Sequence, residues 1–387
     1  MKYFFLAFLF VFSCNSQVEK RPSVDINIRN VYVDYGVQAF SEIQKENDSI
    51  IKRFKECISS KNYSDYDNFW HQNDTSLFKY PFDDLYHVVN TNYPSYEPTI
   101  LAIQKLEPNK YLLKIGMMGS PEGFNSLDFI YNIYAIRSPQ SEFVFKNTIE
   151  DNLMNWNRKT VHNITYYYSP DRILNNDEIQ KQIDFENYLT NFLEIDKIDY
   201  KYVICNSVYE FSKILGYDYV NDMFFTEQSG GINYSEQALF FSGNDKASYP
   251  HEIAHIYLRE KFPKIHPILS EGFTTYVGGS KELHYKEHIK ILRDYISTNE
   301  ISISEYLFDD FKRYTIIGAN SSIMYSCGAL LCDLAFKKYG KTGLFDLLES
   351  NHSDDELKKT IEVVFDIKME NFDDFINDEL KKYDFNE

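Results

Sequence analysis

Hydrophobic positions recur at helical spacing near the start of the chain. Between residues 40 and 58 apolar side chains fall about three or four positions apart, so they lie on one face of a helix. They are Phe40, Ile43, Ile50, Ile51, Phe54 and Ile58. The pattern therefore predicts one amphipathic helix over residues 40–58.

From residue 100 the pattern changes to short runs rich in β-branched and aromatic residues. Gly, Pro and Asn separate these runs, as expected for strands joined by turns. The runs are Ile100–Ile103, Tyr111–Ile115, Ile130–Tyr134 and Phe143–Phe145. A helix followed by a meander predicts an α+β module with one curved sheet. In the order of its elements, this module loosely resembles the nuclear-transport-factor-like domains.

A different pattern begins near residue 160. Helices are predicted over Ile183–Phe192 and over Val208–Leu215, the second ending at Gly216, with a strand over Tyr200–Cys205 between them. One further strand is predicted from Gly230 to Phe241, and nearly everything beyond residue 250 has helical spacing. We therefore expect a small mixed sheet followed by a mostly helical C-terminal part.

The first residues have the composition of an export signal. One lysine precedes nine apolar residues, Phe4 to Phe12, and small polar residues follow. The run is too short to span a bilayer, which needs about 20 residues, but it suits a secretory signal. Val11 to Cys14 resembles the lipobox of bacterial lipoproteins, in which the cysteine becomes the lipidated first residue. We expect a signal peptide over residues 1–13, lipidation of Cys14 and a tether over residues 14–21.

The remaining chain divides into two predicted domains. An α+β domain of unassigned role is expected over residues 22–155, and the domain that carries the chemistry over residues 160–387. Four cysteines remain besides Cys14, and export permits disulfides. These are Cys57, Cys205, Cys327 and Cys332. Nothing in their spacing forces a bridge, so four free, mostly buried thiols are expected.

Acidic residues outnumber basic ones. The chain has 58 Asp and Glu against 40 Lys and Arg, which gives a formal net charge of −18. Such a chain repels phosphate backbones unless it carries a local basic patch, and the sequence has no cluster of Lys and Arg. Nucleic acid is therefore not an expected partner. Membrane contact is expected only through the lipid anchor of an exported lipoprotein in the cell envelope, facing the periplasm or exposed at the surface.

The strongest chemical signal is the His-Glu-x-x-His motif that follows Pro250. Residues four apart share one helix face, so His251 and His255 can bind one zinc ion while Glu252 reaches the metal-bound water. Pro250 suits the first position of a helix, where its missing N–H leaves no hydrogen bond unmade. The sequence therefore predicts a zinc helix with Glu252 as general base.

Two histidines and a water leave tetrahedral zinc one ligand short. The best candidate is Glu271, in a second helix that Ser270 would cap and that a short turn would bring back to the histidines. An acidic residue also favours a helix N-terminus without binding metal. His266 is the rival ligand. Lys261 stands where an extended third-histidine motif would have His, so that subclass is excluded.

A second histidine pair, His284 and His288, also has helical spacing. No glutamate follows the first histidine directly, as it does in the motif at residue 251. The residues around the pair are polar, so we expect a solvated pair rather than a metal site.

These motifs carry a specific resemblance. His251-Glu252-x-x-His255 followed by Glu271-Gly272 resembles the gluzincin metallopeptidases, the superfamily of thermolysin and the aminopeptidase-N-type enzymes, and most closely their peptidase-MA-like group. In that group a strand, an aromatic-rich helix and a Gly-containing edge strand precede the zinc helix, an order that residues 160–350 follow. Tyr325, in Tyr-x-x-Gly, resembles the tyrosine of the aminopeptidase-like branch whose hydroxyl stabilises the tetrahedral intermediate.

The resemblance implies a thermolysin-like zincin domain that binds one zinc ion and hydrolyses peptide bonds in a peptide or protein substrate. Two departures limit it. Gly230–Asn233 lacks the acid with which aminopeptidases hold a free α-amine, and Thr275 replaces the Asp that orients a zinc histidine in thermolysin. Two other function classes stay open: an envelope binding or assembly protein with an inactive peptidase-like domain, and a zinc hydrolase of a non-peptide substrate.

Overall fold

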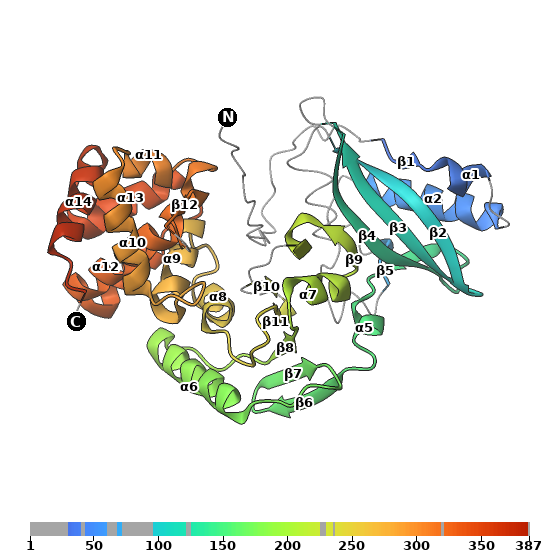
Figure 1. Cartoon of the computed structure of the whole chain (residues 1–387), viewed down its shortest axis with the longest axis horizontal. Coiled ribbons are helices and arrows are strands. Elements are labelled where there is room, and N and C mark those ends of the chain that lie inside the picture. The colour runs from blue at the N-terminus through green and yellow to red at the C-terminus, as the bar shows by residue number, and fades with distance from the viewer. Residues whose placement is uncertain are drawn as a thin grey trace.

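The computed structural model describes most of the chain beyond residue 30. The described residues are 30–39, 43–59, 68–71, 96–120, 125–224, 230–234, 237–318 and 321–385. The protein is a mixed α+β structure with open sheets and a helical C-terminal part (Figure 1), which confirms the predicted fold class. Cys14, like the rest of the predicted signal peptide and tether, lies outside the described residues. Within them, no helix combines the length and the apolar run that crossing a membrane requires.

The first sheet is built on an antiparallel meander. Strands β2 (Tyr96–Glu107), β3 (Lys110–Gly119), β4 (Ser126–Arg137) and β5 (Phe143–Lys146) pair in chain order, and β1 (Tyr32–Val33) adds parallel to β2. Each of the four predicted strands is confirmed, and each extends beyond the apolar run that predicted it. The additional residues complete ladders whose hydrogen bonds do not depend on side-chain type, which is why hydrophobicity underestimates their length.

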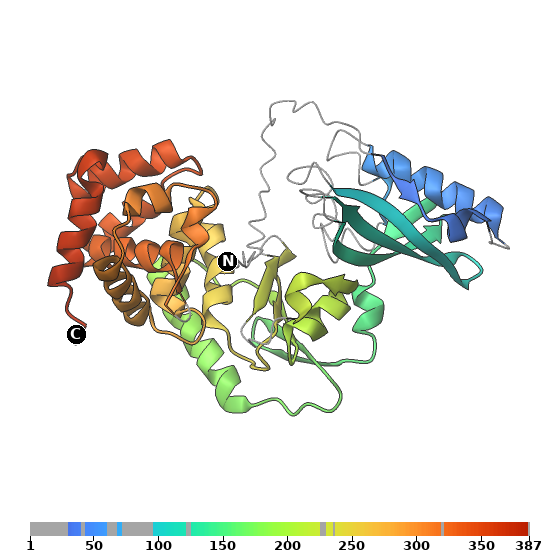
Figure 2. The same ribbon diagram turned by 45° about the horizontal axis from the view of Figure 1, so that its top comes forward.

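Helix α2 (Gln44–Ile58) covers one face of this sheet (Figure 2). Ile50 and Phe54 are fully buried, and the Phe54 ring meets the ring of Phe145 edge-on at 5.8 Å between centroids. The predicted helix is thus confirmed from Gln44 onward, while Phe40 lies outside the described residues. The short helices beside the sheet are α1 (Tyr35–Ala39) and α5 (Ile149–Asn152).

The second sheet has the order β10-β11-β8-β7-β6. Its strands are β6 (Asn157–Val161), β7 (Ile164–Tyr168), β8 (Tyr200–Ile204), β10 (Gly231–Tyr234) and β11 (Leu239–Ser242). β8 runs parallel to both of its neighbours, whereas β10 and β11 form an antiparallel pair with Tyr234 opposite Leu239. The prediction of one strand from Gly230 to Phe241 is therefore wrong, because the chain reverses direction within it.

Helix α7 (Val208–Leu215) and strand β9 (Tyr217–Val220) connect the second sheet to the first. Gly216 ends α7, as predicted, with a left-handed φ of +107° that suits glycine and turns the chain directly into β9. β9 pairs with β4, so the first sheet gains a strand from the second half of the chain. Helix α6 (Asn176–Leu193) precedes β8 in the chain, and the 3₁₀ turn η4 (Asn221–Phe224) follows β9.

Beyond residue 250 the structure is helical, as predicted. The α-helices are α8 (Pro250–Lys261), α9 (Pro267–Gly278), α10 (Tyr285–Thr298), α11 (Ile303–Leu307), α12 (Ile323–Leu348), α13 (Asp354–Phe365) and α14 (Phe372–Lys382). The smaller elements are β12 (Ile316–Ile317), β13 (Ser321–Ser322), η6 (Lys312–Tyr314) and η7 (Met369–Asn371). α12 lies at the centre of this part, and α9, α10 and α13 pack against it.

The cysteines occur as predicted. Cys57, Cys205, Cys327 and Cys332 are all buried and free. Burial raises the pKa of each thiol, so these side chains behave as small core residues.

Candidate metal centre

Helices α8 and α9 pack together and bring three potential ligands to one point. His251 Nε2 lies 3.3 Å from one carboxylate oxygen of Glu271, and His255 Nε2 lies 3.5 Å from the other. One ligand atom of each residue falls within 4.8 Å of the others. His251 and Glu271 are buried, and His255 is half-buried. The structure therefore unites the histidine pair with Glu271 in a group that could hold a metal ion.

Helix α9 begins earlier than predicted. Its N-cap is His266, whose Nδ1 accepts a hydrogen bond from the N–H of Ile268 at 3.2 Å, and Pro267 occupies the first helical position. His266 Nε2 donates to Asp354 at 2.9 Å, so both ring nitrogens are engaged away from the metal group. The prediction that Ser270 caps this helix is wrong, and His266 is not among the three clustered ligands. Both results follow from Pro267, which favours the first position of a helix and so makes His266, the residue before it, the N-cap.

Two groups orient the histidines, and the sequence did not identify either as doing so. His251 Nδ1 donates to the carbonyl of Gly279 at 2.8 Å. Nε2 of the neutral ring is then unprotonated, and its lone pair faces Glu271. His255 Nδ1 lies 3.1 Å from the hydroxyl of Ser270. Such partners fix the ring orientation and the tautomer of a metal-binding histidine. Thr275 takes no such role, because its buried hydroxyl oxygen has no hydrogen-bond partner among the described residues.

Thr274 places a hydroxyl beside both histidines. Its Oγ1 lies 3.5 Å from His251 Nε2 and 3.4 Å from His255 Nε2. The same oxygen donates within α9, toward the carbonyls of Ser270 and Glu271 at 3.0 and 3.1 Å. Its spacing of three residues from Glu271, which puts both on one helix face, is the sequence signal that could have identified it.

The charges around the group set its protonation. Burial would raise the pKa of the Glu271 carboxyl, but the neighbouring His255 and His251 outweigh burial and hold that pKa well below its usual range. Glu271 is therefore a carboxylate. Two neutral imidazole nitrogens and one carboxylate are the donor set of several zinc enzymes, so the residues present fit a transition-metal ion.

Glu252 lies beside strand β10, at the edge of the second sheet. A Cβ added to Gly231 would stand 3.0 Å from Glu252 Cγ, so the glycine leaves room for this side chain. Burial raises the pKa of Glu252 to about 7; the neighbouring His251 opposes the rise, and the Glu271 carboxylate adds to it. A carboxyl group with a pKa near neutrality can both accept and return a proton.

Tyr325 joins the site from α12. Its ring centroid lies 6.0 Å from that of His251, with the planes nearly perpendicular at 87°. Ser322 caps α12 by accepting the backbone N–H of Tyr325 at 3.3 Å. Burial raises the pKa of Tyr325 well above its ordinary value, and Glu271 and Glu252 raise it further, so the hydroxyl keeps its proton as a hydrogen-bond donor.

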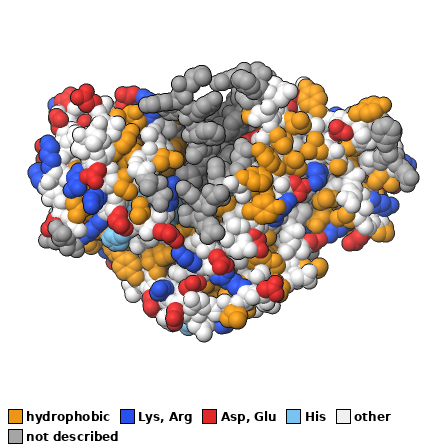
Figure 3. Space-filling view, viewed as in Figure 1, with side chains coloured by type: hydrophobic (Ala, Val, Ile, Leu, Met, Phe, Trp, Pro, Cys, Tyr) orange, Lys and Arg blue, Asp and Glu red, His pale blue; other side chains and the backbone are white. Residues whose placement is uncertain are grey.

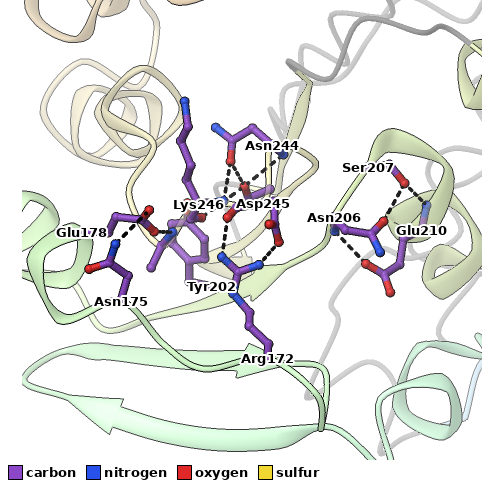
Figure 4. Close-up of polar contacts among 12 residues, drawn as sticks. Arg172, Asn175, Glu178, Tyr202, Asn206, Ser207, Glu210, Asn244, Asp245 and Lys246 are labelled. Carbon is purple, nitrogen blue, oxygen red and sulfur yellow. Dashed lines mark hydrogen bonds and ion pairs between the residues drawn. The ribbon is translucent and has the colours of Figure 1, made fainter.

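The loop that leads into α8 is held by residues on and just before α6 (Figure 4). Arg172 forms an ion pair with the carboxylate of Asp245 and donates to its carbonyl. Glu178 accepts the N–H of Ala247 at 2.8 Å, and Gln182 accepts the N–H of Tyr249, the residue before α8, at 3.0 Å. These contacts fix the start of the helix that carries both histidines.

The second histidine pair is divided between surface and core. His284 is exposed and caps α10, whereas His288 is fully buried. The expectation that both are solvated is therefore wrong for His288, because α10 turns this residue toward α12. Neither residue belongs to the three-residue ligand group described above.

Basic side chains are scattered over the face of the molecule in Figure 3. Among the described residues on that face, Lys and Arg are interspersed with Asp and Glu rather than gathered in a patch.

No protein-family model matches the chain, and a search of curated proteins finds no match.

Proposed function

We propose that this protein is a zinc-dependent metallopeptidase. The observation that carries the proposal is the convergence of His251, His255 and Glu271 within 4.8 Å, with Glu252 on the same helix as the histidines. One water completes this ligand set in catalytic zinc sites, whereas structural sites take four protein ligands. An open ligand position beside a carboxyl group of raised pKa favours hydrolysis.

The side chains of the site would divide the chemistry among them. A zinc ion held by these three ligands would polarise the scissile carbonyl and lower the pKa of a bound water toward about 7. Glu252 would accept the proton of the attacking water and return it to the leaving nitrogen. Tyr325 would donate a hydrogen bond to the oxyanion of the tetrahedral intermediate.

The edge position of β10 supports a peptide as the substrate. β10 ends the second sheet, pairs with β11 among the described strands and packs against α8. An extended peptide can add to the edge of a sheet through backbone hydrogen bonds. Gly231 on this strand stands against Glu252, so a peptide aligned with β10 would pass the general base.

A Glu252→Gln variant tests the proposal. The purified protein should contain close to one equivalent of zinc and cleave a peptide library, and a chelator should stop the cleavage. Glu252→Gln should keep the zinc and lose activity by a factor of about 10² to 10⁴. Glu260→Gln, an exposed acid on the same helix, is the matched control and should keep full activity.

Three results would contradict the proposal. A protein that binds no zinc would exclude the metal-dependent mechanism, and an unaffected Glu252→Gln variant would exclude its general base. Zinc bound without any peptide cleavage would favour one of two alternatives, a binding or assembly protein with an inactive domain or a hydrolase of non-peptide substrates.

We also propose that the protein is exported and anchored in the cell envelope by lipid on Cys14. The short apolar run before this cysteine and its lipobox-like sequence support the proposal. Labelled fatty acid should be incorporated into the wild-type protein and not into Cys14→Ser. Equal labelling of both proteins would exclude this site.

A further inference from the structure

Helix α10 carries a buried histidine that the proposed mechanism does not use. His288 has no exposed surface, and both of its ring nitrogens are within hydrogen-bond distance of a partner. Nε2 lies 3.0 Å from the carbonyl oxygen of Ser280, and Nδ1 lies 2.6 Å from the hydroxyl of Ser321. A carbonyl only accepts, so Nε2 carries the proton and Nδ1 accepts from Ser321. His288 is therefore held in one neutral tautomer.

The carbonyl that His288 contacts belongs to a strained turn. Ser280 and Leu283 exchange backbone hydrogen bonds of 3.0 and 2.8 Å. Between them, Lys281 and Glu282 have φ values of +48° and +65°. Two successive non-glycine residues in the left-handed region are unfavourable and persist only where the surroundings hold them. The hydrogen bond from His288 to Ser280 is one such restraint.

The same turn holds a metal ligand. The carbonyl of Gly279, directly before Ser280, accepts the hydrogen bond from His251 Nδ1 at 2.8 Å. A shift of the turn would therefore move the acceptor that orients His251. Loss of a partner of this kind typically lowers metal affinity by about 10- to 100-fold.

On its other side, His288 contacts β13, the short strand that leads into α12. The Ser321 hydroxyl, which donates to His288, also lies 2.6 Å from the hydroxyl of Ser326. Ser326 then donates to Ser321, Ser321 donates to His288 Nδ1, and His288 Nε2 donates to the carbonyl of Ser280. Each of these polar hydrogens thus makes one hydrogen bond. The Tyr325 ring is near two imidazoles, with its centroid 6.0 Å from that of His251 and 6.3 Å from that of His288.

We propose that His288 is a positioning residue that holds the Gly279–Leu283 turn, and through it His251, in fixed relation to the start of α12 and Tyr325. The effect of His288 on His251 is an effect on metal binding and does not depend on peptide hydrolysis. The effect of His288 on Tyr325 rests on the proposed function, in which Tyr325 stabilises the oxyanion. A histidine that only filled the core would stabilise the fold without changing the properties of a bound metal.

Three variants separate positioning from stability. His288→Leu removes both hydrogen bonds, His288→Gln retains one donor and one acceptor, and Ile289→Ala destabilises α10 from the next buried position. Zinc affinity is measured by competition with a chelating dye on the full chain. The absorption spectrum of the cobalt-substituted protein reports the ligand geometry, and peptide hydrolysis gives kcat and KM separately.

We expect His288→Leu to weaken zinc binding about 10-fold and to alter the cobalt spectrum, as loss of an outer partner of a metal ligand does. His288→Gln should restore most of the affinity, and Ile289→Ala should lower thermal stability while leaving zinc affinity and the spectrum unchanged. With a peptide substrate, His288→Leu should lower kcat more than it raises KM.

Wild-type zinc affinity and an unchanged spectrum in His288→Leu would overturn the proposal. If His288→Leu does not fold, His288→Met decides the question, because a flexible side chain of similar size fills the space without making either hydrogen bond. An altered cobalt spectrum in His288→Met supports positioning, and an unaltered one refutes it. The metal measurements do not depend on hydrolysis, so failure of the peptidase proposal would be recognised separately.

Discussion

Gly272 of α9 and Gly328 of α12 lie against each other where the two helices cross. A Cβ added to Gly272 would stand 2.4 Å from the carbonyl carbon of Gly328, and one added to Gly328 would stand 2.7 Å from Gly272 Cα. Glu271 directly precedes the first glycine, and Tyr325 lies one helical turn before the second. The crossing therefore sets the relation between a candidate metal ligand and the tyrosine that faces it.

The substitution Gly328→Ala should be destabilising. At an exposed position within a helix, Gly→Ala would add about 1 kcal/mol to the free energy of unfolding. A decrease instead would therefore indicate that the two backbones are in close contact. We expect a loss of about 2 kcal/mol in the free energy of unfolding, because the new methyl group meets backbone that cannot move aside. Urea denaturation measures it.

Gly340 provides a contrast to this prediction. It lies at a kink within α12, where its φ of +66° and ψ of −158° are not helical, and no atom of the described residues stands within 4 Å of an added Cβ. Gly340→Ala should also be destabilising, by about 1 to 3 kcal/mol, but through backbone strain rather than through contact, because this combination of φ and ψ is essentially restricted to glycine. A stabilised Gly328→Ala protein would contradict the role we assign to the crossing.

Ser270→Ala and Thr275→Val form a second, matched test on α9. Ser270→Ala removes the partner of His255 Nδ1, so we expect metal affinity to fall about 10-fold. Thr275→Val replaces a buried hydroxyl that has no hydrogen-bond partner in the described part of the chain, so stability should stay the same or rise, by about 1 kcal/mol at most. Equilibrium metal binding and thermal unfolding measure both. Weaker metal binding in Thr275→Val would show that Thr275 does orient a ligand.

Metal binding should stabilise the folded protein. Zinc at about 1,000 times its dissociation constant should add about 4 kcal/mol to the free energy of unfolding, since the ligands converge only in the folded chain. Glu271→Gln should lose most of this increment, while Glu252→Gln should retain it. Calorimetry with and without zinc checks the expectation. A zinc-dependent shift that survives in Glu271→Gln would place the metal elsewhere.

Stability should fall as the solution is acidified from pH 6.5 toward pH 4. Burial lowers the pKa of His266 to about 4 despite its hydrogen bond to Asp354. In that pH range the unfolded chain binds a proton that the folded chain does not, so the free energy of unfolding decreases by up to about 1.4 kcal/mol per pH unit for this group. His288, with its pKa also lowered by burial to about 4, contributes with the same sign.

A His266→Asn variant isolates the His266 contribution. Asparagine can still cap α9 but does not titrate. Between pH 4 and 6.5 the free energy of unfolding of the variant should therefore depend less steeply on pH than that of the wild type. Urea denaturation of both proteins at pH 5 and pH 7 gives the difference. Equal slopes would show that His266 is not the titrating group.

The sequence by itself determined the local features of this protein. Periods of hydrophobicity marked the helix ending at Ile58, the four strands of the meander and the helical C-terminal part. The spacing of His251 and His255 placed both on one helix face. These predictions succeed because side-chain direction in a helix or strand depends only on residues a few positions apart.

The tertiary structure alone decided how distant groups meet. The division of residues 230–241 into two strands and the addition of β9 to the first sheet depend on pairing with remote partners. The Gly279 carbonyl that orients His251 has no signature in the sequence, because every residue carries a carbonyl. The same is true of the contact between Gly272 and Gly328 and of the burial of His288. A candidate metal centre could thus be located from the sequence, but the groups that hold its ligands in place follow from packing.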